Sequence, residues 1–170
     1  MKKNLFLIFF LLLAWTQLLA QPNWTYNNTG ANHTILVQPS VVQVDGMPLS
    51  NGDYIGVFYT VGAGPDLACG GYELVTGSNL GLTAWGTEAG LNNGFANGEE
   101  FKWKVWRASD GVVIDMTATY QTSGFPNQGN YVTNGISGLA SLTGSAPVVS
   151  FSVTGTSTDV SCYAACDGDI

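Results

Sequence analysis

Two alternating segments decide the fold prediction for this chain, and they read Phe101-Lys102-Trp103-Lys104-Val105-Trp106 and Val112-Val113-Ile114-Asp115-Met116-Thr117-Ala118-Thr119-Tyr120. Apolar residues recur at every second position in both, which is the pattern of a strand with one buried and one exposed face. Trp106 falls on the same face as the two lysines, opposite the apolar set. Ser109-Asp110-Gly111 lies between the segments and is typical of a tight turn. We therefore predict an antiparallel hairpin over residues 101–120.

Short apolar runs recur elsewhere along the chain, at residues 34–37, 41–44 and 54–59, with turn signals such as Asp45-Gly46 between them. The sequence carries no stretch with helical periodicity, and only Leu80 to Leu91 has room for a helical turn. We therefore predict an all-β domain over residues 21–143, an antiparallel β-sandwich of the immunoglobulin or jelly-roll kind.

The composition narrows the classes of partner. The 170 residues are 45% hydrophobic and only 10% charged, so the chain is not an acidic disordered tail. Twelve acidic residues stand against five basic ones, which gives a net charge of −7. A chain of this charge repels phosphate, and nucleic acid is therefore excluded as a partner.

The first twenty residues have the layout of a secretory signal peptide. Two lysines precede an apolar run of eleven residues from Leu5 to Trp15, and a small residue, Ala20, stands at the expected cleavage point. An uncleaved anchor is the alternative, although eleven residues are too few to span a bilayer comfortably. Cleavage would leave three basic residues against twelve acidic ones, a net charge of 3 − 12 = −9. We expect an exported protein, secreted or on the outer cell surface, without a membrane span after cleavage.

The three cysteines divide into one isolated residue and one pair. Cys69 is expected to pack as a small buried hydrophobe. Cys162 and Cys166 lie four residues apart, and either a local disulfide or two free thiols fits that spacing. A metal site would need further ligands, and the only histidine, His33, is distant in sequence.

After a linker at residues 144–150, the segment 151–170 resembles the opening of an SprB-type repeat. The residues that carry the resemblance are Asp159-Val160-Ser161-Cys162, Cys166 and Asp167-Gly168. That family consists of short immunoglobulin-like β-modules strung along very large bacterial cell-surface adhesins, including those used in gliding. The resemblance implies a truncated second β-module followed by further repeats of the same chain. We therefore expect this sequence to be the N-terminal fragment of a larger adhesin.

The larger domain also resembles a module that follows the signal peptide of large proteins exported by the type IX secretion system. The residues that carry this resemblance are Asn32-His33-Thr34-Ile35, Asp45-Gly46, Gly52 to Tyr59, Cys69-Gly70-Gly71-Tyr72, Ala84-Trp85-Gly86, Gly98 to Lys104 and Asn134-Gly135. The resemblance implies a surface setting and carries no catalytic activity. The family pattern has two aspartates after Ala-Trp-Gly, where this chain has Thr87 and Glu88.

Catalysis has little support in the sequence. No nucleophile elbow is present, and the adjacent Glu99 and Glu100 would point to opposite faces of a strand. His33 is expected to be a polar turn residue before Thr34 and not a general base. We predict a module that is not an enzyme.

Calcium is the cofactor for which the sequence offers candidate ligands. Asp45, Asp53 and Glu88 lie near turns, as do Asp66 and the Glu99-Glu100 pair, and exported β-modules often bind calcium through such oxygens. None of them forms a spaced calcium-binding loop. Solvated turn residues explain the same acids equally well.

Aromatic side chains suggest a carbohydrate site as a further hypothesis, because sugar rings stack on exposed, coplanar rings. The aromatic residues that could supply such a platform are Trp24, Tyr26, Tyr59, Trp85, Trp106 and Tyr131. We select Trp106, Trp85 and Tyr59 as the candidate site, and Trp106 is expected to be the most exposed. Phe58, Trp103 and Tyr120 are expected in the core. The function we predict is a non-catalytic adhesin module that contacts a surface polysaccharide or another cell-surface ligand. The alternative is a carbohydrate-binding module of a secreted multidomain enzyme.

Overall fold

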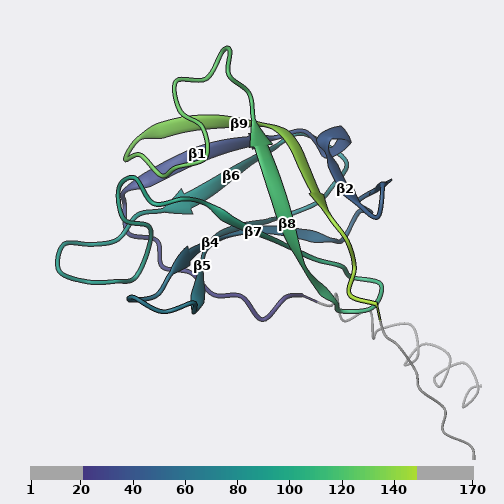
Figure 1. The fold of residues 1–170 in the computed structure, drawn as a ribbon, viewed down its shortest axis with the longest axis horizontal. Helices are drawn as coiled ribbons and strands as arrows, with labels where there is room; N and C mark the ends of the chain where they lie inside the picture. Colours follow the sequence, from purple (N-terminus) through teal and green to yellow (C-terminus); the bar gives the residue numbers. More distant parts are fainter. Residues whose placement is uncertain (1–20, 149–170) are drawn as a thin grey trace, which may run out of the picture.

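The computed structural model describes residues 21–148 and shows an all-β domain (Figure 1). Its elements are β1 (Asn32–Val37), a single 3-10 turn η1 (Pro39–Val41), β2 (Val42–Val44), β3 (Met47–Pro48), β4 (Tyr54–Thr60), β5 (Leu67–Leu74), β6 (Leu80–Trp85), β7 (Lys102–Trp106), β8 (Val113–Tyr120) and β9 (Gly135–Gly144). The predicted all-β sandwich class is confirmed. The helical turn considered for Leu80 to Leu91 does not form, and its first half is strand β6.

The predicted hairpin is confirmed by the pairing of β7 with β8. Trp103 faces Met116 and Lys104 faces Asp115 in antiparallel register. Ile114 and Met116 are buried while Asp115 between them is exposed, as the alternation predicts.

Strand β9 joins the two parts of the sandwich. The larger sheet has the order β3-β2-β9-β8-β7-β4-β5, and β1 pairs with β6 and with the first half of β9. Figure 1 shows β9 curving from beside β1 to beside β8. β9 lies between β8 and the first strands of the chain. It is antiparallel to β8 but parallel to β1 and β2. The sheet is therefore mixed, whereas the sequence predicted antiparallel strands throughout.

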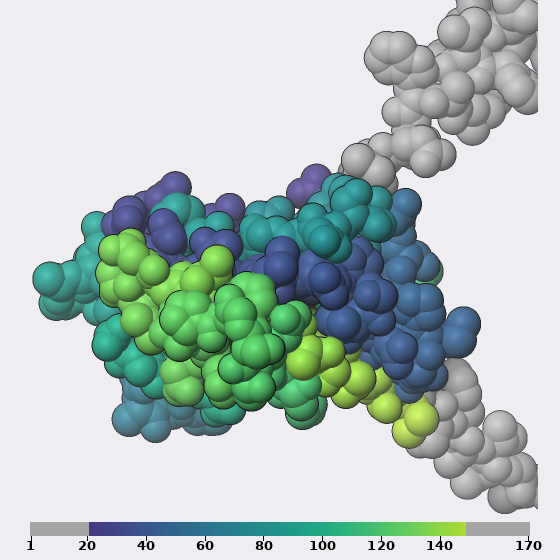
Figure 2. Space-filling view, turned by 90° about the horizontal axis from the view of Figure 1, so that it is seen from above, coloured from purple at the N-terminus to yellow at the C-terminus, as the bar shows by residue number. Residues whose placement is uncertain are grey.

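The core fills the space between the two parts of the sheet. Large apolar side chains from almost every strand meet there, among them Ile35, Val57, Leu82, Trp103, Ile114 and Leu142. Close backbone contact between β5 and β6 helps to close one side, because a Cβ on Gly71 would lie 1.9 Å from the carbonyl oxygen of Thr83. On another side, the segment after β8 folds back onto β9 (Figure 2). A Cβ on Gly138 would lie 2.5 Å from the Phe125 ring of that segment.

Candidate functional site

The three aromatic residues predicted to bind sugar do not form a site. Trp106 is 7% exposed and Tyr59 is 5% exposed, so the prediction that they present rings to solvent is wrong. Tyr59 points into the core and packs on Phe95, with ring centroids 5.6 Å apart. Trp85 is half-buried at the end of β6. The three residues lie on different strands and share no face.

Trp106 is buried because a second aromatic cluster covers its side of the sheet. We call this the outer aromatic cluster, and its members are Trp24, Tyr26, Tyr54, Phe58, Tyr72 and Trp106. Residues 21–31 precede β1 and bring Trp24 onto the outer face of β4. Trp24 lies so close to Gly56 that a Cβ there would be 2.8 Å from the indole. The strand alternation predicted the correct face for Trp106, but it did not predict that other aromatic rings would cover that face.

The geometry of the outer aromatic cluster also excludes a flat stacking platform. Trp24 meets Phe58 at 86° and Tyr72 at 69°, and Tyr26 meets Tyr72 at 79°. Edge-to-face pairs of this kind stabilise the rings against one another. They leave no common plane on which consecutive sugar rings could stack.

The predicted calcium ligands Asp45, Asp53 and Glu88 are not brought together. Asp53 is 3% exposed, and its two oxygens accept hydrogen bonds from the backbone N–H groups of Ser50 and Ala108, both at 2.9 Å. Asp45 has a positive φ of 52° and accepts from the backbone of Ala146. Glu88 accepts from Asn93 at 2.7 Å. Across residues 21–148 no group of three or more His, Cys, Asp and Glu side chains is arranged to hold a metal ion.

His33 is a buried strand residue, and the prediction of a polar turn residue is wrong. Its Nδ1 accepts a hydrogen bond from the backbone N–H of Val132 at 3.0 Å, and its Nε2 lies 2.8 Å from Ser137 Oγ. Ser137 Oγ in turn donates to the carbonyl of Gln128 at 2.6 Å. Burial lowers the pKa of His33. The network therefore holds a neutral imidazole with its proton on Nε2, and the serine hydroxyl is already used.

Cys69 is buried as predicted, and burial raises its pKa to about 11, so the thiol is a packing group. Cys162 and Cys166, the predicted disulfide, lie outside the described residues. The same holds for the predicted signal peptide at residues 1–20 and the SprB-like segment 151–170.

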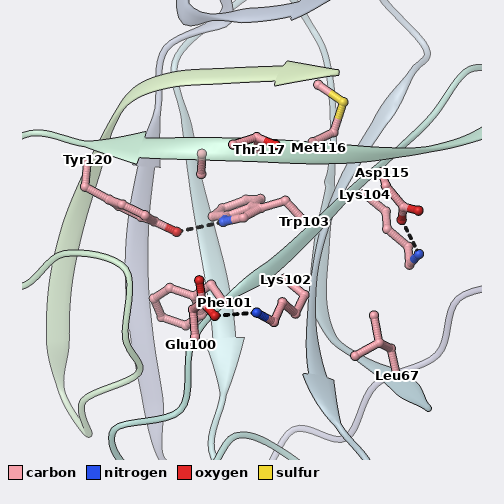
Figure 3. A pocket seen from close by; sticks show the side chains of 11 residues that line it. Leu67, Glu100, Phe101, Lys102, Trp103, Lys104, Asp115, Met116, Thr117 and Tyr120 are labelled. Carbon is pink, nitrogen blue, oxygen red and sulfur yellow. Dashed lines mark hydrogen bonds and ion pairs between the residues drawn. The ribbon is translucent and has the colours of Figure 1, made fainter. Parts of the chain in front are cut away.

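A hollow opens where β7 and β8 separate (Figure 3). The two strands pair only as far as Trp103 and Met116, after which β8 continues beside β9 and β7 beside β4. The hollow has a volume of about 410 Å³, and Lys102, Lys104, Asp115 and Tyr120 are among its lining residues. Trp103 Nε1 donates to Tyr120 Oη across the gap at 2.7 Å. Burial raises the pKa of Tyr120 to about 12, so its hydroxyl keeps its proton at physiological pH.

A second, shallower hollow of about 570 Å³ adjoins the first, because Asp115 and Thr117 line both. Gln43, Asp45 and Thr143 line its other side. Thr117 on β8 faces Thr143 on β9, which in turn faces Gln43 on β2. We call the two hollows together the outer trough; it crosses β7, β8, β9 and β2.

Both lysines in the outer trough are paired with carboxylates, whereas Asp45 at its other side has no basic partner among the described residues. Lys102 forms an ion pair with Glu100, and Lys104 forms one with Asp115. Lys104 Nζ also lies 5.8 Å from the centroid of the Phe58 ring, which holds the ammonium by a cation–π contact. The trough therefore presents hydroxyls, an amide, two ion pairs and the Asp45 carboxylate, a set suited to hydrogen bonding. The sequence placed Asp115 and Thr117 on a polar face but did not show which strands would lie beside them.

No family model, curated protein or solved structure matches this chain significantly. Within residues 21–148, no helix is long and apolar enough to cross a membrane.

Proposed function

We propose that this chain is an exported, non-catalytic module of a cell-surface adhesin that makes reversible contacts with other surfaces. The observation that carries the proposal is the outer trough, an open polar surface that crosses four strands of one sheet. A surface of this kind binds through many weak contacts on a rigid support and needs no reactive group. The signal-like residues 1–20 and the SprB-like residues 151–170 support a setting outside the cell.

The chemistry of the buried polar groups agrees with a binding role. In hydrolysis by a serine or cysteine nucleophile, the histidine base must reach the substrate and the nucleophile must be free to attack. His33 and Ser137 are fully buried and hydrogen-bonded to each other and to backbone groups. Their arrangement stabilises the junction of β1 and β9 and leaves these groups no access to a substrate.

Bead attachment tests the proposal directly. Residues 21–170 are coupled to beads, which are settled on bacterial cell lawns and washed at physiological salt, with albumin beads and heat-unfolded protein as controls. We expect retention of the folded-protein beads well above both controls and no release of sugar or peptide products into the medium. Retention equal to that of albumin beads would overturn the proposed function, and so would products that accumulate in proportion to the protein.

A further inference from the structure

We propose that the outer trough binds a neutral polysaccharide whose chain lies across the strands, from β7 over β8 and β9 to β2. This inference rests on the proposed function and names the ligand class of the same surface. The residues proposed to contact the ligand are polar and lie in the trough, in place of the aromatic residues Trp106, Trp85 and Tyr59 predicted from the sequence.

The dimensions of the outer trough fit an extended chain. Neighbouring strands lie about 4.8 Å apart, so the three steps from β7 to β2 cover roughly 14 Å. Two adjoining hollows of about 410 and 570 Å³ follow that line. The surface is thus longer than a single sugar unit.

The side chains along the outer trough offer the alternating donors and acceptors that vicinal hydroxyls require. Asp115 uses Oδ1 for Lys104 and leaves Oδ2 as an acceptor, and its side chain is 85% exposed. Thr117 and Thr143 are exposed neighbours on adjacent strands, and each hydroxyl can donate and accept. Gln43 adds an amide at the far end.

Tyr120 lines the hollow between β7 and β8 and brings a hydroxyl to it. Its Oη accepts from Trp103 Nε1, which leaves the hydroxyl proton to be donated elsewhere, and no residue in the described part of the chain accepts it. The ring is held in place against Gly129, where an added Cβ would lie 2.9 Å from Tyr120 Cε2. A sugar oxygen in the hollow between β7 and β8 would complete this hydrogen bond.

The charge balance selects neutral over anionic polymers. Both lysines of the trough already have a carboxylate partner, Glu100 for Lys102 and Asp115 for Lys104. An anionic sugar would have to displace one of these partners, and it would approach a chain with a net charge of −7. A neutral hydroxylated chain can bind without breaking either ion pair.

Affinity electrophoresis tests the inference. Residues 21–170 are run through native gels that contain a neutral glucan, mannan or xylan, or anionic alginate. The variants are Asp115→Asn, Tyr120→Phe and the double variant Thr117→Ala/Thr143→Ala. Asp110→Asn is the matched control, because Asp110 also pairs with a basic residue, Arg107, but lies outside the trough. The double variant removes only exposed hydroxyls, so it tests the site even if Tyr120→Phe lowers stability.

We expect retardation by at least one neutral polysaccharide, with binding about tenfold weaker in Asp115→Asn and Tyr120→Phe and unchanged in Asp110→Asn. Retardation that the trough variants do not change would overturn the inference. Retardation by alginate alone, or by none of the gels, would overturn it as well. In each of these cases bead attachment to cells could still succeed, so the failure of the ligand class is distinguishable from the failure of the proposed function.

Discussion

On the outer face of the large sheet, the part formed by β5, β4 and the end of β7 is covered by aromatic rings, whereas the part formed by β8, β9 and β2 is open and polar. Both parts belong to one sheet and follow the same alternation of side chains. They differ because residues 21–31 bring Trp24 onto one part only. Whether a sheet face is covered or open thus depends on a distant segment of the chain, and the composition of the strands alone does not decide it.

Removal of Trp24, the side chain that covers the outer face of β4, should have the largest effect on stability. Trp24→Ala deletes a half-buried indole that packs on Phe58 and Tyr72, and we expect a loss of about 2–3 kcal/mol in the free energy of unfolding. Urea denaturation measures the loss, and near-UV circular dichroism should show weaker ordering of the outer aromatic cluster. Trp85→Ala is the control, because Trp85 is half-buried outside the cluster. A change below about 0.5 kcal/mol for Trp24→Ala would mean that the segment does not hold the cover in place.

The contact between Trp24 and Gly56 should behave as a coupled pair. Gly56→Ala puts a Cβ 2.8 Å from Trp24 Cζ3, and we expect overpacking to cost about 1–2 kcal/mol. In the Trp24→Ala background the same substitution should cost clearly less, since only the contact with Phe58 remains. Urea midpoints of the four proteins of this double-mutant cycle provide the test. Additive effects would show that the two residues do not press against each other.

The sequence alone supported part of this comparison. Alternation was sufficient for the β7–β8 hairpin and for the faces on which Asp115 and Thr117 lie. It could not predict the burial of Trp106, because the ring that packs on it, Tyr54, comes from β4, which is distant in sequence and pairs with β7 only in the folded sheet. Gly70 and Gly71 weaken the strand pattern of β5, and Gly71 is nevertheless suited to its position because β6 leaves no room for a side chain there. The outer trough was not predictable, since it depends on the long-range pairing of β9 with β2 and β8.

In the hollow between β7 and β8, Tyr120→Phe should have an intermediate effect. The substitution leaves the Trp103 indole N–H without its acceptor, and we expect a loss of about 1–2 kcal/mol in the free energy of unfolding. Tyr131→Phe is a matched control, because Tyr131 Oη is buried without a hydrogen-bond partner among the described residues. Thermal melts of both variants compare the two hydroxyls. Equal melting temperatures would contradict a stabilising role for the Trp103–Tyr120 bond.

The pH dependence of stability tests a core residue, His33, which belongs to neither part of the outer face. His33 is the only histidine, it is fully buried, and burial lowers its pKa below the ordinary value of 6.5. As the pH falls below about 6.5, the unfolded chain takes up a proton that the folded protein still excludes. Stability should therefore be complete above this pH and decline towards pH 5.5, as urea midpoints would show. His33→Gln should remove most of this slope, and an equally flat profile for the unmodified protein would contradict the argument.

The smallest effect is expected on the open polar part. Thr117→Ala and Thr143→Ala remove exposed hydroxyls for which the structure shows no hydrogen bond, so each should change the free energy of unfolding by less than about 0.5 kcal/mol. Thr119→Ala on the same strand should cost more, because Thr119 Oγ1 lies 2.6 Å from Ser141 Oγ. If Thr117→Ala and Thr143→Ala were as costly as Trp24→Ala, the polar part would be a structural surface. If they are silent in urea denaturation, these hydroxyls are not needed for the fold and remain available to a ligand.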